Sequence, residues 1–315
     1  MSQIKVTEIT ARDTGTSNIQ LNSDGDTTLL SQNTGQLAGL RNQIINGNMQ
    51  IWQRGTTFTD IGAGQYIADR WFVLGSDADF ERKTWSNGKP YLWMSAPTSG
   101  TSITQRIEIE NLYGFEGKEM TLSAKVQTDK PDDVKFIDIT YRQTNGDYIS
   151  MVQAESAATG LTAGVWGNIS ITFTLPPIPA DTGCLQLGVM SGADNQTIEV
   201  FDVQLEVGPV ATPFEQRFIG LELSLCQRYF VRTPSNYVIW TGAVDTGVTY
   251  SVSIPYPVPM RVTPTVNNVT SAGGSLFGAP SVNTSSSYST ILKASATNTG
   301  NNAYYFAGFD ADAEL

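Results

Sequence analysis

This 315-residue sequence contains no histidine, so carboxylates are the main candidates for catalytic side chains. Without histidine, Ser-His-Asp and Cys-His catalysis and zinc sites that use His are excluded. Hydrolysis of a polysaccharide stays open, since it needs only two carboxylates. The charged residues to consider stand in sequence motifs near both ends of one region, and they are Arg54, Asp69, Arg70, Glu215 and Arg217.

These five residues favour a structural role over a catalytic one. The arginines alternate with acids in short motifs, and an arginine guanidinium pairs with a carboxylate in a bidentate way. We therefore expect salt bridges that pin the start of the region to its end. No catalytic residue is assigned, and the chain is predicted not to be an enzyme.

Aromatic residues are the second candidate chemistry, because an aromatic face can stack against the apolar face of a sugar ring. Trp52 and Trp71 lie in the charged motifs and are predicted to fill a core or a seam between subunits. Trp85 stands in the polar, turn-like stretch TWSNGKP, whereas Trp93 belongs to an alternating strand and is expected in the core. The candidate ligand contacts are Trp85, Tyr237, Trp240, Tyr304 and Tyr305.

Asp202, with Glu206 nearby, is the candidate for a calcium ligand, although no DxDxDG loop is present. Calcium takes six to eight oxygen ligands, and backbone carbonyls among them leave no mark in a sequence. A hydrogen-bonded strand aspartate is the alternative, and no other cofactor is expected.

The net charge is −11, and no run of basic residues occurs. Nucleic-acid binding is therefore excluded, because phosphate contacts need clustered Lys and Arg. No stretch is long and apolar enough to span a bilayer, and the opening MSQIKVTEIT has no apolar core of a secretory signal. Cys184 and Cys226 are expected as two reduced, buried thiols.

The hydrophobic pattern predicts an all-β chain in four parts. Residues 1–45 form an extended β leader with too few apolar side chains for a core of its own. Residues 46–217 contain short alternating strands separated by turn residues, which is typical of an antiparallel jelly-roll β-sandwich. Residues 218–230 have helical spacing and form a linker helix. Residues 231–315 hold only seven charged residues and form a small β-sandwich.

Several motifs resemble a phage tail-fibre family. They are INGNMQIWQRGTTF at 45–58, YIADRW at 66–71, FDVQLEVGPVATPFEQR at 201–217 and LCQRYF at 225–230. The resemblance covers about 46–230, and the leader is similar to those of marine and cyanobacterial phage structural proteins. It implies a jelly roll like those of carbohydrate-binding modules, carried on a virion. The structural motif residues in it are Trp52, Arg54, Asp69, Arg70, Trp71, Glu215 and Arg217.

The sequence thus predicts a homotrimeric virion fibre that attaches to other tail or adaptor proteins through its N-terminus. It would bind a host surface polysaccharide or receptor without catalysis, through the almost uncharged segment of residues 231–315. Two alternatives remain: a carbohydrate-binding module outside any virion, and a depolymerase with a carboxylate pair.

Overall fold

The structure is a computed structural model, and it describes residues 8–10, 17–21, 27–29 and 41–315. The chain divides into two compact units, residues 1–41 and 42–315. In the first unit, β1 (Glu8–Thr10), β2 (Ser17–Leu21) and β3 (Thr27–Leu29) form an antiparallel sheet in sequence order.

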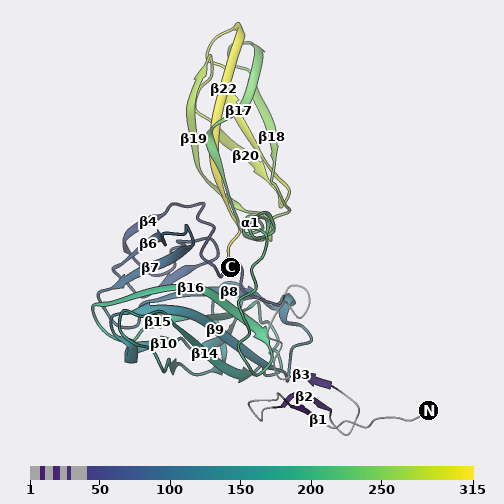
Figure 1. Cartoon of the computed structure of the whole chain (residues 1–315). Helices are drawn as coiled ribbons and strands as arrows, with labels where there is room; N and C mark the ends of the chain where they lie inside the picture. Colours follow the sequence, from purple (N-terminus) through teal and green to yellow (C-terminus); the bar gives the residue numbers. More distant parts are fainter. Residues whose placement is uncertain (1–7, 11–16, 22–26, 30–40) are drawn as a thin grey trace, which may run out of the picture. The chain divides into compact units, whose positions relative to one another are not determined.

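The second unit begins with a sandwich of two antiparallel sheets (Figure 1). The six-stranded sheet has the order β14 (Gly167–Thr174), β9 (Glu119–Thr128), β16 (Gln196–Val207), β7 (Pro90–Ala96), β6 (Ala78–Thr84) and β4 (Thr57–Ile61). In the seven-stranded sheet, β15 (Cys184–Ser191) is central, with β8 (Ser102–Glu108) and β5 (Phe72–Leu74) on one side. Its other side carries β10 (Val134–Phe136), β11 (Ile139–Arg142), β12 (Tyr148–Gln153) and β13 (Ser156–Ala157). Two 3₁₀ turns, η1 (Ile109–Leu112) and η2 (Pro131–Asp133), connect strands.

The sandwich forms because each strand presents one apolar face. In β9, Leu122, Ala124 and Val126 are buried, while the residues between them are only half-buried. Phe80, Leu92 and Leu187 join the same core from other strands. This is the period-two pattern that a half-buried antiparallel strand requires. The side chains of opposite parity face outward from the six-stranded sheet.

A single α-helix, α1 (Ile219–Gln227), follows the sandwich. Its buried residues are Glu222 and Cys226, while Ile219 and Leu221 are exposed. Cys184 and Cys226 are both free and buried, as the sequence predicts. Among the described residues, no helix is long and apolar enough to cross a membrane.

The chain ends in a second, smaller sandwich, which we call the tip (Figure 1). One sheet has the order β17 (Phe230–Val244), β22 (Gly300–Asp312) and β19 (Thr265–Ser275), and the other β18 (Thr249–Pro255), β21 (Ser289–Ser295) and β20 (Ser281–Ser285). Its core includes Ile254, Leu292 and Phe309. The predicted all-β architecture with one linker helix is confirmed.

Candidate functional site

The two motif tryptophans hold backbone near the start of the jelly roll. Trp71 is fully buried, and its indole Nε1 donates to the carbonyl oxygen of Asn46 over 3.0 Å. Trp52 is half-buried, and its Nε1 donates to the carbonyl oxygen of Met49 over 2.7 Å. Both indole donors are thus used within the fold, which is how a buried tryptophan is normally satisfied.

The closing motif contacts the opening segment directly. The Glu215 carboxylate accepts a hydrogen bond of 2.6 Å from the backbone N–H of Asn42. Arg217 donates to the carbonyl oxygen of Ile44 over 3.0 Å and lies 3.4 Å from the Glu222 carboxylate. The two ends of the jelly roll are therefore held together by charged side chains that bond to backbone as well as to each other.

Arg54 and Arg70 have different partners from those that the pinning hypothesis implied. Arg54 lies 3.7 Å from Asp69, but its closer contacts are Asp312 at 3.2 Å and Glu314 at 3.3 Å. Arg70 also pairs with Glu314. Both arginines thus connect the jelly roll to the tip rather than to Glu215, because the end of β22 returns to this edge of the sandwich.

Asp69 is fully buried, so no part of its carboxylate lies on the surface. Its carboxylate accepts hydrogen bonds from the backbone and side chain of Gln53, at 3.1 and 2.6 Å. Burial raises the pKa of Asp69 to about 6, against the opposing effects of Gln53 and Arg54. A shifted pKa often marks an active site, but here the shift comes from desolvation of a structural group.

The predicted calcium ligand is engaged otherwise. One oxygen of Asp202 lies 2.8 Å from the Lys89 ammonium. Burial raises the pKa of Asp202, while Lys89 and Lys125 act to lower it. In the described part of the chain, no three acidic or cysteine side chains come together as a metal site. A carboxylate beside two ammonium groups does not fit a divalent cation.

The five candidate ligand contacts are not brought together. Trp85 is half-buried on the jelly roll, and Tyr304 is exposed on the tip. Tyr305 is only 3% exposed, because it lies on the inward face of β22 with the tip core, so it cannot contact a ligand. The side chains of Tyr237 and Trp240 lie outside the described residues.

Trp85 belongs to an aromatic cluster on the outward face of the six-stranded sheet. We call this cluster the aromatic ridge; its members are Trp85, Tyr91, Trp166 and Phe201. The Trp166 ring centroid lies 5.3 Å from Trp85, 5.6 Å from Tyr91 and 4.9 Å from Phe201, all edge to face. Trp85, Tyr91 and Trp166 are half-buried, whereas Phe201 is covered by the others. Pairs in this geometry stabilise one another by about 0.5–1.5 kcal/mol.

Local backbone geometry places these rings. Trp85 sits in the β6–β7 hairpin, where Gly88 has a φ of 83°, a left-handed conformation that glycine adopts without strain. Trp166 immediately precedes β14. Tyr91 and Trp93 share the outward parity of β7, because Leu92, Met94 and Ala96 fill the core. The prediction that Trp93 lies in the core is therefore wrong; its ring is covered by the Lys83 ammonium at 4.1 Å instead.

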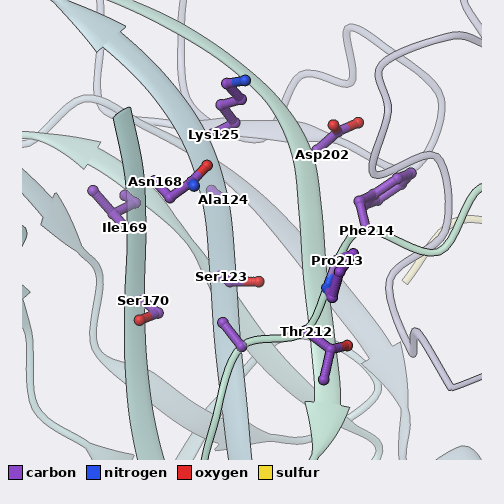
Figure 2. Close-up of a pocket in the computed structure, with 11 residues that line it drawn as sticks. Ser123, Ala124, Lys125, Asn168, Ile169, Ser170, Asp202, Thr212, Pro213 and Phe214 are labelled. Atoms are coloured by element: carbon purple, nitrogen blue, oxygen red, sulfur yellow. The ribbon is translucent and has the colours of Figure 1, made fainter. Parts of the chain in front are cut away.

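A hollow of about 460 Å³ adjoins the ridge and is drawn in Figure 2. We call it the lysine hollow. Its floor consists of Asn168 and Ser170 from β14 and Lys125 and Ser123 from β9, which are paired across the two strands. Asp202 from β16 and the segment Thr212, Pro213 and Phe214 line the opposite side (Figure 2).

A second hollow of about 390 Å³ opens over β9 and β16. It is lined by polar side chains that include Gln127, Asp129, Thr197 and Glu199. Along β9, its residues follow those of the lysine hollow. Both volumes fall within the range of ordinary small-molecule sites. Trp166, Lys125 and Phe214 were not among the predicted site residues, and neither hollow was predicted.

No family model and no curated protein matches this chain. Solved structures with a similar fold include the xylan-binding CBM22-1 domain of Paenibacillus barcinonensis Xyn10C, at 16% identity and a TM-score of 0.33, covering 49% of this chain and 94% of that domain. A sugar-binding protein described as putative, from Bacteroides thetaiotaomicron, has 11% identity and a TM-score of 0.40, with 53% and 100% covered. A cyclase from Fischerella sp. TAU has 10% identity and a TM-score of 0.38, with 55% and 99% covered.

Proposed function

We propose that this chain is a non-catalytic carbohydrate-binding protein that acts as a phage virion fibre. The observation that carries the binding part is the aromatic ridge between two polar hollows on the outward sheet face. The virion part rests on the motif resemblance of residues 46–230 to phage tail fibres.

Sugar recognition needs both kinds of surface that this face offers. A pyranose has an apolar face that packs on an aromatic ring, and hydroxyl groups that need hydrogen-bond partners. Trp85 and Trp166 are half-buried, so part of each indole is available to solvent. Serine, threonine and amide side chains line the hollows on either side.

A fibre would turn weak sugar sites into firm attachment. In the proposed virion, residues 1–45 bind other tail or adaptor proteins and three copies of the chain assemble. Several copies engage one cell surface at a high effective concentration, which can raise the apparent affinity by about 10²–10⁴ without a new contact. Shallow hollows of the kind seen here suit that arrangement.

The binding proposal is tested by applying the full chain to an array of host and bacterial polysaccharides, followed by titration calorimetry with an oligosaccharide of the best ligand. Trp166→Ala removes the ring that contacts the three others of the ridge, and we expect it to weaken binding about tenfold or more. Tyr113→Ala, which removes an exposed aromatic ring beyond the end of η1, serves as the matched control. Equal affinities for wild type and Trp166→Ala would contradict the proposal.

The virion proposal has its own test. Antibodies to the chain should label particles of a phage that encodes it, at one position in electron micrographs. Purified chain should also compete with that phage for adsorption to host cells. If the particles lack the chain, the virion part of the proposal is contradicted, whereas the carbohydrate-binding part is unaffected.

A further inference from the structure

Lys125 is the unusual residue of the lysine hollow. Its side chain is half-buried, and no hydrogen bond or ion pair in the described part of the chain engages its ammonium. Its one aromatic contact is with Phe201, whose ring centroid lies 5.7 Å away. Most lysines on this sheet are engaged otherwise: Lys83 with Glu81 and Lys89 with Asp202.

The local charge is positive even though the chain carries −11 overall. Asp202 is the only acid that lines the hollow, and Lys89 neutralises it at 2.8 Å. Lys125 also interacts electrostatically with Asp202 but makes no ion pair with it, so Lys89, Asp202 and Lys125 together carry one net positive charge. An ammonium in a concave, partly desolvated site attracts an anion more strongly than the same group on an open surface.

The other floor residues supply neutral hydrogen-bonding groups. Ser123, Asn168 and Ser170 have no hydrogen-bond partner for their side chains among the described residues. Residues two apart on a strand are about 7 Å apart, and neighbouring strands are about 5 Å apart. Four polar groups therefore form a rectangle comparable to one pyranose unit. Phe214 is half-buried and lines the opposite side of the hollow, and its ring points away from these floor residues (Figure 2).

We infer that the lysine hollow is a subsite for an anionic sugar, one pyranose unit that carries a carboxylate or a sulfate ester. Lys125 pairs with the anionic group, and Ser123, Asn168 and Ser170 bond to hydroxyls. This inference rests on the proposed function and adds the charge class of the glycan to it. The ridge then binds the neighbouring sugar units.

The test is calorimetric titration of the full chain with a galacturonate tetramer, its neutral methyl ester, and a sulfated galactose oligosaccharide. The work is done at physiological ionic strength, where a Debye length of about 8 Å screens the net charge of the chain. Wild type should bind at least one charged oligosaccharide about ten- to a hundredfold more tightly than the neutral ester, as expected for a charge-assisted hydrogen bond. The tighter of the two charged ligands distinguishes carboxylate from sulfate.

Three variants locate the effect. Lys125→Met keeps the length of the side chain and should abolish the preference for charge, while Lys125→Arg should retain it. Lys135→Met removes a lysine from β10 in the other sheet and should change nothing. If Lys125→Met keeps the preference, or if wild type binds neither charged oligosaccharide more tightly than the ester, the inference is overturned. In that case, if wild type still binds the neutral ester and Trp166→Ala weakens that binding, the proposed function stays intact. Failure of wild type to bind any glycan would overturn both the inference and the proposed function.

Discussion

Arg70 in the jelly roll and Glu314, just beyond β22 of the tip, form a buried ion pair. The Arg70 side chain is 1% exposed and that of Glu314 is 4% exposed. The guanidinium also stacks on the Tyr229 ring at 3.5 Å, next to the end of α1. The Arg70 side chain thus contacts both the tip and the segment that leads into it.

Removal of Glu314 is predicted to destabilise the protein strongly. Glu314→Ala leaves the Arg70 charge buried without its carboxylate, and loss of one partner of a buried pair costs about 3–5 kcal/mol. Chemical denaturation of the full chain measures the change in unfolding free energy. Glu110→Ala, at an exposed acid of η1, is the control and should stay within about 0.5 kcal/mol of wild type. A similar value for both variants would mean that the pair does not stabilise the fold.

The closing contact of the jelly roll gives a smaller predicted effect. Glu215→Ala deprives the buried backbone N–H of Asn42 of its acceptor at 2.6 Å. An unsatisfied buried donor costs about 1–3 kcal/mol. The loss should appear as a lower melting temperature without the loss of a specific ligand contact, because Glu215 is buried and does not itself line the lysine hollow. A variant that melts like wild type would speak against this pinning.

Asp69 predicts a pH dependence of stability. Its pKa in the folded protein is about 6, above the ordinary aspartate value of 3.8 that describes the unfolded chain. The folded state therefore holds the proton more tightly. The associated stability is fully present below pH 3.8 and is lost as the pH rises to about 6. Above that range both states are ionised and the full desolvation cost remains.

Comparison with Asp69→Asn isolates this contribution from the other acids. Glu108 and Asp310 have lowered pKa values and change stability in the opposite sense. The difference in unfolding free energy between wild type and Asp69→Asn should shift against wild type between pH 4 and 6. A difference that stays constant over this range would show that Asp69 does not titrate there.

The sequence predicted the strands well where only one parity is apolar. In β9, Leu122, Ala124 and Val126 alternate with polar residues, so the buried face is unambiguous. In β7 both parities carry large apolar side chains, and the pattern alone does not say that Leu92 and Met94 face the core while Trp93 faces outward. The neighbouring strands decide which face of β7 carries Trp93: it is paired with Glu81 of β6 and Glu199 of β16, on the outward face of the sheet.

The lysine hollow was beyond sequence reasoning for a different reason. Lys125 alternates with core residues as any solvent-facing lysine does, so it carries no signal by itself. Its significance comes from its register with Asn168, which lies 43 residues further along the chain, and from the segment containing Phe214 that covers part of the sheet. Long-range register of this kind is set by packing rather than by local residue types.

The proposed homotrimer is tested by light scattering of the full chain. The expected mass is three times that of one chain and should not change on dilution into the micromolar range. Phe218→Ser tests whether this side chain, which is 89% exposed in the single chain, contributes to the contact between chains in the trimer. A monomer at all concentrations would contradict the trimer.

The last prediction decides which end of the chain meets the host glycan. The sequence predicts that residues 231–315 contact the glycan. Of the candidate contacts there, Tyr304 is the one whose side chain is described and exposed. The aromatic ridge and the two hollows, in contrast, lie on the jelly roll. Deleting the tip cannot answer the question, because it would leave Arg70 unpaired in the interior. Tyr304→Ala and Trp166→Ala are instead compared in one adsorption-competition assay with intact phage. The aromatic ridge makes more ring contacts and adjoins two hollows, so we expect Trp166→Ala to lose competition while Tyr304→Ala retains it. The reverse result would assign host recognition to the tip and leave the sheet face with another ligand.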